Sequence, residues 1–154
     1  MKKLLLLFIS LLLFAANTFA EIKITDIKKD NDKFNITLND SLKIMEITLK
    51  TDKDGAVLEF PAYINKGKVY KQIIVLRKDF NKNLAAALKN NQISKSAGDI
   101  KFKTGEFEKV KNHKTIAAFC SIIFEDVLEV KCRVMKGKTG FWIAWPSVKQ
   151  GNKW

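Results

Sequence analysis

FNITLNDSLKIMEITLKTDKDGAVLEFP, residues 34–61, is the stretch of sequence that decides the fold. Short runs in which apolar and polar side chains alternate are separated by turns rich in Asn, Asp, Ser and Gly, at residues 39–41 and 51–55. Alternation broken by such turns predicts an antiparallel meander of short strands. The expected strands are residues 34–38, 42–50, 56–60 and 71–76.

The pattern returns further along the chain, in residues 119–146, FCSIIFEDVLEVKCRVMKGKTGFWIAWP. Laying this stretch on the first without a gap places Gly55 on Gly140 and Pro61 on Pro146, the only two prolines. The same alignment matches Phe34 with Phe119, Asp40 with Glu125, Leu42 with Val127, Met45 with Val130, Leu49 with Val134 and Leu58 with Ile143. We interpret the chain as two copies of one unit, since a single copy is too small to bury much of a core.

One helix is expected, at residues 79–90. Asp79 is the expected N-cap, and Phe80, Leu84, Ala87 and Leu88 then recur on one face. The expected fold is therefore α+β and mainly antiparallel β. It consists of two β-meander repeats packed as a pseudo-dimer with the one helix between them.

The expected boundaries follow from this repeat. Residues 1–20 are a targeting segment, residues 21–93 are the first repeat with its helix, and residues 94–154 are the second repeat, which has no C-terminal helix.

The N-terminal segment, residues 1–20, has the pattern of a secretory signal peptide. Lys2 and Lys3 precede an uncharged, mostly apolar run at residues 4–16, and Thr18 and Ala20 provide the small residues of a cleavage site. Cleavage near Ala20 predicts an exported protein, periplasmic or secreted. The alternative is a retained membrane anchor, but the apolar run is short for a spanning helix, which needs roughly 20 residues.

The chain is strongly basic. It has 28 Lys and Arg against 16 Asp and Glu, a formal net charge of +12. Such a charge favours polyanionic partners, namely nucleic acid, anionic lipid headgroups or acidic glycans, and charge alone does not choose among them. A basic surface that only keeps the protein soluble is an equally good interpretation of the charge.

Both copies carry a family resemblance. Residues 24–90, from "ITDIKKD" through "DGAVLEFP" to the helix, resemble the stage V sporulation protein G (SpoVG, septation regulator) family. Residues 117–147, AAFCSIIFEDVLEVKCRVMKGKTGFWIAWPS, are similar to the same family in their glycine turn and following aromatic and Pro-Ser residues. The resemblance implies a small antiparallel sheet with a C-terminal helix that dimerises through its strands.

The resemblance also implies a function. Members of this family regulate septation and sporulation and bind DNA and RNA through basic residues in and after the loop that follows the proline. The matching positions here are Lys66, Lys68, Lys71, Arg77, Lys78 and Lys82 in the first copy, and Lys149 and Lys153 in the second. We therefore expect a nucleic-acid-binding module in an exported protein. The protein is expected to be a monomeric pseudo-dimer or a higher oligomer formed through strand edges.

The alternative is an envelope or secreted interaction protein. It would use the same basic sheet to bind a protein partner or an anionic polymer. Location separates the two interpretations, because an exported protein meets little nucleic acid.

Cys120 and Cys132 lie at equal distances in sequence on either side of Asp126. If the hairpin turn centres on residues 125–127, the two cysteines face each other across antiparallel strands, close enough for a disulfide. Two buried free thiols acting as small hydrophobic side chains are the equally weighted alternative.

The aromatic residues near the second proline allow two interpretations. Strand alternation places Trp142 on the face opposite Phe141 and Trp145. We expect core or interface packing rather than base stacking, although rings beside lysines are able to stack bases.

No catalytic or cofactor chemistry is expected. His113 is the only histidine and lies in a polar stretch, so we expect it at the surface. The sequence does not contain the full set of residues that a metal site or an acyl-transfer site requires. Its carboxylates are scattered among lysines. We predict that the protein is not an enzyme and holds no cofactor or metal.

Overall fold

The computed structural model describes residues 22–53, 55–95 and 98–147. The expected signal peptide at residues 1–20, and the predicted contacts Lys149 and Lys153, lie outside the described residues. The described part of the chain contains no helix long and apolar enough to cross a bilayer.

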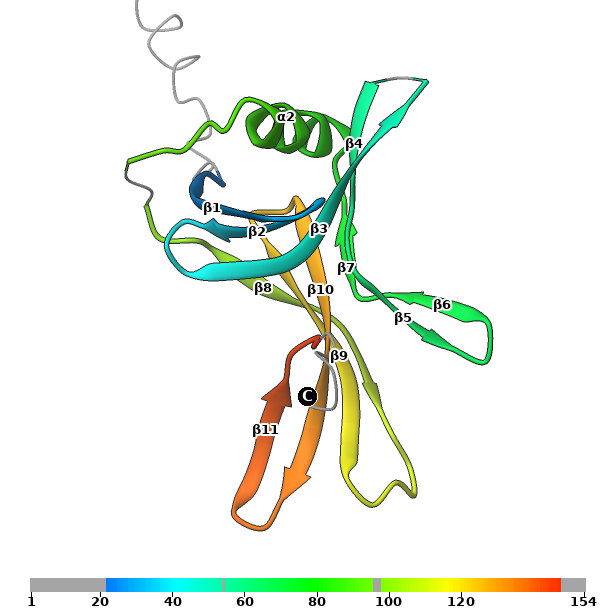
Figure 1. Cartoon of the computed structure of the whole chain (residues 1–154). Coiled ribbons are helices and arrows are strands. Elements are labelled where there is room, and N and C mark those ends of the chain that lie inside the picture. The colour runs from blue at the N-terminus through cyan, green and yellow to red at the C-terminus, as the bar shows by residue number, and fades with distance from the viewer. Residues whose placement is uncertain (1–21, 54, 96–97, 148–154) are drawn as a thin grey trace, which may run out of the picture.

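The described chain is built mainly from antiparallel strands, with helix α2 (Lys78–Lys89) covering one sheet (Figure 1). This confirms the expected α+β class. The first sheet is a four-stranded meander whose strands pair in chain order. Its strands are β1 (Ile24–Asp30), β2 (Lys33–Leu38), β3 (Leu42–Asp52) and β4 (Gly55–Glu59).

A second antiparallel meander follows the helix, again in chain order. Its strands are β8 (Phe102–Lys109), β9 (Ile116–Phe124), β10 (Leu128–Gly137) and β11 (Gly140–Ala144). On the edge away from β9, β10 pairs first with β7 (Ile73–Val75) and then with β11. Figure 1 shows the consequence: one half of this sheet lies against the first sheet, and the half with β11 projects away from it.

A small hairpin separates the two sheets along the chain. It consists of β5 (Ala62–Asn65) and β6 (Lys68–Lys71), which pair only with each other in the described structure. The single strand expected at residues 71–76 is divided between the end of β6 and β7. The strand is interrupted at Gln72, whose carbonyl accepts a hydrogen bond from the Lys131 N–H at 2.8 Å.

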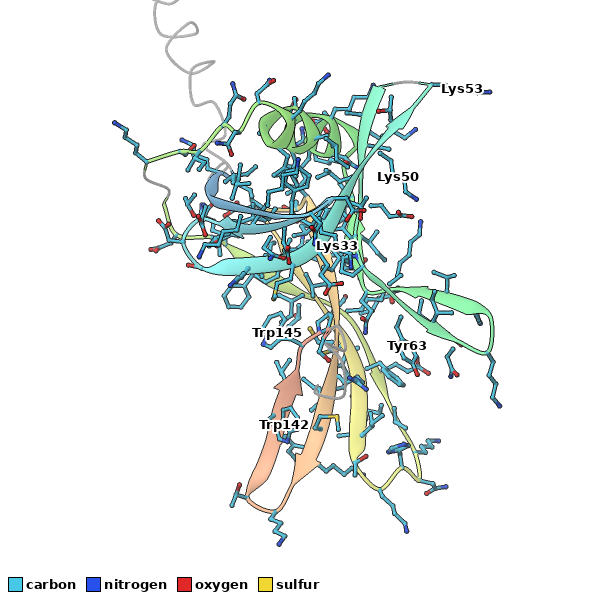
Figure 2. The ribbon with its side chains drawn as sticks, viewed as in Figure 1. Lys33, Lys50, Lys53, Tyr63, Trp142 and Trp145 are labelled. Atoms are coloured by element: carbon cyan, nitrogen blue, oxygen red, sulfur yellow. The ribbon has the colours of Figure 1, made fainter. Side chains whose placement is uncertain are left out.

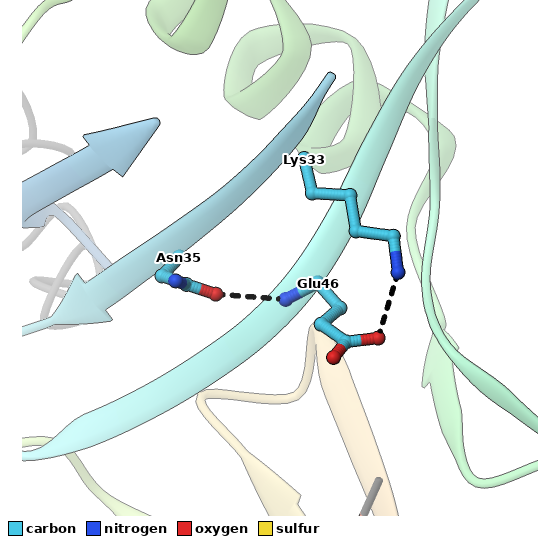
Figure 3. Close-up of polar contacts among 3 residues, drawn as sticks. All are labelled: Lys33, Asn35 and Glu46. Carbon is cyan, nitrogen blue, oxygen red and sulfur yellow. Dashed lines mark hydrogen bonds and ion pairs between the residues drawn. The ribbon is translucent and has the colours of Figure 1, made fainter. Parts of the chain in front are cut away.

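A bulge in β3 sets which of its side chains face inward. Glu46 has a φ of 59°, and its N–H donates to Asn35 Oδ1 at 2.9 Å (Figure 3). Its carboxylate pairs with Lys33 Nζ at 3.0 Å, and this contact raises the pKa of Lys33. The extra residue allows Ile44 and Ile47, three positions apart, both to be buried in the core.

The core lies between the first sheet, α2 and the near half of the second sheet. The first sheet contributes Ile36, Leu38 and Ile47, and the helix contributes Leu84, Ala85 and Leu88. The second sheet contributes Phe124, Leu128, Val130 and Cys132. The N–H of Leu58 donates to Asn81 Oδ1 at 3.1 Å and so attaches the helix to the edge strand β4.

The helix begins one residue earlier than expected. Arg77 occupies the N-cap with extended backbone and no side-chain capping bond, so the expectation that Asp79 caps the helix is wrong. Asp79 lies in the first turn, where its charge suits the positive end of the helix dipole, and pairs with Arg77. The helix ends at Lys89, before Asn90 and Asn91, as the sequence predicts.

The two meanders have matching hairpins. The turn residues Asn39 and Asp40 both have positive φ, and so do Glu125 and Asp126. The N–H of Asn39 donates to the carbonyl of Lys23, and the N–H of Glu125 donates to that of Lys101, both at 3.0 Å. The second hairpins also agree, because Asp52 pairs with Gly55 and Gly137 pairs with Gly140.

The gap-free alignment does not match the first hairpin turns of the two meanders. By position in the turn, Asp40 matches Asp126 rather than Glu125, because the β3 bulge has no counterpart in β10. Counted from these turns, Phe34 and Phe119 do not occupy equivalent positions. Phe34 is buried, whereas Phe119 is 46% exposed on the opposite face of its sheet.

Candidate nucleic-acid interface

The β5–β6 hairpin stands clear of both sheets (Figure 1). Its tight turn is Lys66-Gly67, with φ values of 48° and 77°, between the paired residues Asn65 and Lys68. Two positive φ values at such a turn match the right-handed twist of the flanking strands, and glycine adopts them without strain. Every residue of both strands is exposed.

One face of this hairpin carries two aromatic rings. Tyr63 and Tyr70 are directly paired, with ring centroids 6.1 Å apart and planes inclined by 42°. Lys68 Nζ lies 5.3 Å from the Tyr70 ring centroid, at a distance suited to a cation–π contact. Figure 2 shows Tyr63 on the β5–β6 hairpin. We call the exposed face formed by Tyr63, Asn65, Lys68 and Tyr70 the tyrosine face.

The charge around the tyrosine face is of one sign. Residues 60–78 contain no Asp or Glu, and they include Lys66, Lys68 and Lys71. None of these three lysines takes part in an ion pair found in the described residues. The hairpin therefore presents uncompensated positive charge beside stacking surfaces.

The six predicted contacts of the first copy form two groups. Lys66 and Lys68 lie at the hairpin tip and Lys71 at its base, whereas Arg77, Lys78 and Lys82 lie at the start of α2, beyond β7. Arg77 donates through Nε to Asp79 Oδ1 at 3.1 Å. This contact lowers the pKa of Asp79 and raises that of Arg77, so the charge of Arg77 is already partnered.

The sequence-based expectation of a basic loop after Pro61 missed these tyrosines. The segment AYINKGKVYK is a regular hairpin around Lys-Gly, and the alternation that places Tyr63 and Tyr70 on one face is present in the sequence. Two short alternating runs on either side of a turn that contains glycine were the signal for it.

A cleft opens beside the helix start. It is lined by the beginning of β1, by Arg77, Asp79 and Phe80, and by the turn that includes Glu125 and Asp126. No group of His, Cys, Asp or Glu suited to hold a metal ion occurs in the part of the chain that the structure describes. Arg77 and Asp79 in this cleft form an ion pair with each other.

Cys120 and Cys132 are directly opposite each other in the β9–β10 pair, which confirms the expected register. Both are free thiols; Cys132 is buried and Cys120 is partly buried. Burial, with a smaller contribution from Cys120, raises the pKa of Cys132 to about 11. Burial also raises the pKa of Cys120. A bridge between them stays a prediction.

His113 is exposed, as expected, and the aromatic residues before Pro146 are not in the core. Phe141, Trp142 and Trp145 are 72%, 55% and 47% exposed, so of the two packing interpretations the core one is wrong for them. Trp145 stacks on Phe124 with ring centroids 6.5 Å apart.

No family model, no curated protein and no solved structure matches this chain. The SpoVG resemblance therefore rests on the residues quoted in the sequence analysis.

Proposed function

We propose that the chain is an exported, non-catalytic nucleic-acid-binding protein of the SpoVG type, and that its tyrosine face holds single-stranded DNA or RNA. The observation that carries this proposal is the combination of two exposed, adjacent tyrosine rings with three lysines in a segment without acids. Proteins that bind single strands combine a positive track for phosphates with aromatic rings on which bases stack.

The geometry favours single strands over duplexes. Bases in a duplex are stacked on each other and hide their faces, so they are not free to stack on Tyr63 and Tyr70. Lys68 lies on the tyrosine face beside the rings and Lys66 lies at the hairpin tip, whereas Lys71 pairs with Ala62 on the opposite face. A strand that crosses the tyrosine face would therefore meet positive charge on the tip side of the rings.

We also propose that the two meanders are copies of one unit packed as a pseudo-dimer, with residues 21–93 and 94–154 as its halves. The shared strand order, the shared second-hairpin register and the equivalent turn bonds of Asn39 and Glu125 support this. The first half carries the hairpin and the helix after its proline, so we assign nucleic-acid contact mainly to that half.

The test replaces Lys66, Lys68 and Lys71 with Glu and measures binding of a fluorescent single-stranded oligonucleotide at low salt. We expect affinity to fall at least tenfold in the triple variant. The slope of log affinity against log salt should become shallower by about 2, since each phosphate contact on a single strand contributes about 0.7.

A matched control carries the same change of charge elsewhere. Lys43, Lys95 and Lys101 are exposed and lie outside the hairpin, and their triple change to Glu keeps the tyrosine face intact. We expect a smaller loss in this control. Equal losses in the two triple variants would show that only the total charge matters, and the assignment to the hairpin would be abandoned.

A further inference from the structure

A second exposed surface lies at the other end of the molecule. We call residues 107–120 and 132–144, the part of the second sheet that extends away from the first, the projecting half. Large apolar side chains there are 44–72% exposed in five cases, Phe107, Phe119, Phe141, Trp142 and Ile143. Exposed large apolar side chains gathered in one region of a protein mark a candidate site of interaction.

The exposed rings occupy both faces of the projecting half. Trp142 pairs with Met135 and Phe119 pairs with Arg133, and these rows lie on one face of the sheet. Ile143 pairs with Val134, and Phe141 with Lys136, on the opposite face. A rigid partner lying flat on the sheet would cover only one of these faces.

The end of the projecting half is densely basic. Its two hairpin loops and the strand ends beside them carry Lys109, Lys111, Lys114, Lys136 and Lys138, and the stretches 109–124 and 130–147 contain no acid. The N–H of Lys136 donates to the carbonyl of Thr115 at 2.7 Å, and Lys136 Nζ donates to the carbonyl of His113 at 3.2 Å. These bonds hold the two loops side by side. None of the five lysines is in an ion pair within the described residues.

The loop before β9 is also ordered by its histidine. His113 Nδ1 accepts the N–H of Ile116 at 2.9 Å and that of Thr115 at 3.2 Å. The lysines of this loop therefore lie on a segment whose conformation is held by hydrogen bonds.

We propose that this end of the second sheet binds an anionic membrane surface, with the tips of its hairpins in the headgroup region. A medium that the sheet enters end-on covers aromatic side chains on both of its faces, which a flat, rigid partner does not. Trp is favoured at the boundary between headgroups and acyl chains, and lysines that flank it attract anionic lipids.

The dimensions agree with shallow insertion. Phe141, Trp142 and Ile143 follow Gly140 at the turn end of β11, and three strand residues span about 10 Å. Peripheral apolar segments bury about 5–10 Å into this boundary region. Figure 2 shows Trp142 on β11 and Tyr63 on the β5–β6 hairpin, so the two surfaces belong to different elements.

The experiment measures sedimentation of the purified protein with vesicles of phosphatidylglycerol and phosphatidylcholine, and with vesicles of phosphatidylcholine alone. We expect binding to the anionic vesicles, at least tenfold weaker binding to the neutral ones, and a blue shift of tryptophan emission on binding. Phe141→Ser with Trp142→Ser should reduce binding at least tenfold, and Lys111→Gln with Lys138→Gln should reduce it at low salt. Because these side chains are exposed, the variants should keep the circular dichroism spectrum and melting temperature of the parent.

Tyr63→Ser with Tyr70→Ser is the matched control, as it also removes two exposed rings. It should leave vesicle binding unchanged, and the Phe141 and Trp142 variant should leave oligonucleotide binding unchanged. The proposal is overturned if anionic vesicles are not bound, or if the Phe141 and Trp142 variant binds them as the parent does. It is also overturned if that variant instead converts a dimer to a monomer or loses a cross-linked protein partner without any vesicle binding in the parent.

Discussion

Tyr63 lies directly opposite Tyr70 in the β5–β6 hairpin, and the two ring centroids are 6.1 Å apart. Aromatic pairs at this separation are common in protein cores, but here both residues are exposed, at 48% and 42%. An unburied pair of this kind contributes little to the core and is available to a ligand.

The first prediction concerns these rings. Tyr63→Ala and Tyr70→Ala should each weaken binding of single-stranded oligonucleotides by about 1–3 kcal/mol, because each removes one stacking surface. The Phe variants should keep most of the affinity, since the ring remains. Fluorescence anisotropy titrations at one fixed salt concentration measure the difference. Alanine variants that bind as tightly as the parent would remove the rings from the interface.

The second prediction concerns Gly105 in β8, where the pairing with β9 shifts register between Thr104 and Phe107. A Cβ at Gly105 would clash with Ser121 Oγ, and Ser121 is buried and accepts the N–H of Glu106 at 2.9 Å. Gly105→Ala should therefore destabilise the protein by about 1–3 kcal/mol in urea unfolding. The double variant with Ser121→Ala should lose less than the sum of the single variants, because the clash disappears. Full additivity would contradict the contact.

The third prediction concerns the attachment of the helix. Asn81 Oδ1 accepts the N–H of Leu58 on the edge strand β4. Asn81→Leu keeps the size of the side chain but leaves this N–H without its partner, and should destabilise the fold by about 1–2 kcal/mol. Asn83→Leu, at an exposed position of the same helix, is the control. Amide exchange at Leu58 should become faster only in the Asn81 variant.

The features predicted correctly from the sequence are those determined by residues close together along the chain. Strands β2, β3 and β4 of the first meander and the end of the helix were predicted, because local alternation and turn residues determine them, whereas β1 was not predicted. The facing of Cys120 and Cys132 was also predicted, since the turn at residues 125–127 fixes the register. These are short-range effects.

The errors had long-range causes. The match of Phe34 with Phe119 failed because Glu46 adds one residue to β3, and a shift by one residue moves a side chain to the other face. The pairing of β7 with β10 depends on where the two sheets meet, which no local pattern determines. The tyrosine face was present in the alternation of residues 62–71, but a hairpin exposed on both sides has no buried face to distinguish it from a loop.

The fourth prediction concerns pH. In the folded protein the pKa of Cys132 is raised from 9.0 to about 11, because burial disfavours the thiolate. The unfolded chain therefore releases this proton first as the pH rises, so the contribution of Cys132 to stability is present below pH 9 and is lost between pH 9 and about 11. The stability of the parent should fall more steeply over this range than that of Cys132→Ala. If the free energy of unfolding had the same pH dependence in the two proteins across this range, the burial of the thiol would be contradicted.

The same pair of cysteines gives a redox test. Cross-strand neighbours are close enough for a disulfide. In the protein recovered from an oxidising compartment, non-reducing mass spectrometry distinguishes a bridge, which lowers the mass by two hydrogens, from two free thiols. Thiol labelling of the native, reduced protein should modify the partly buried Cys120 before Cys132.

The most direct test of the central proposal compares three polyanions across a range of salt concentrations. The purified protein is titrated with a single-stranded oligonucleotide, with the matching duplex and with heparin. If the tyrosine face binds nucleic acid, the single strand should bind most tightly, and its advantage should persist at high salt, where stacking remains and charge attraction is screened. Affinities for all three that converge and vanish together as salt increases would show attraction by charge alone and would contradict the proposed function.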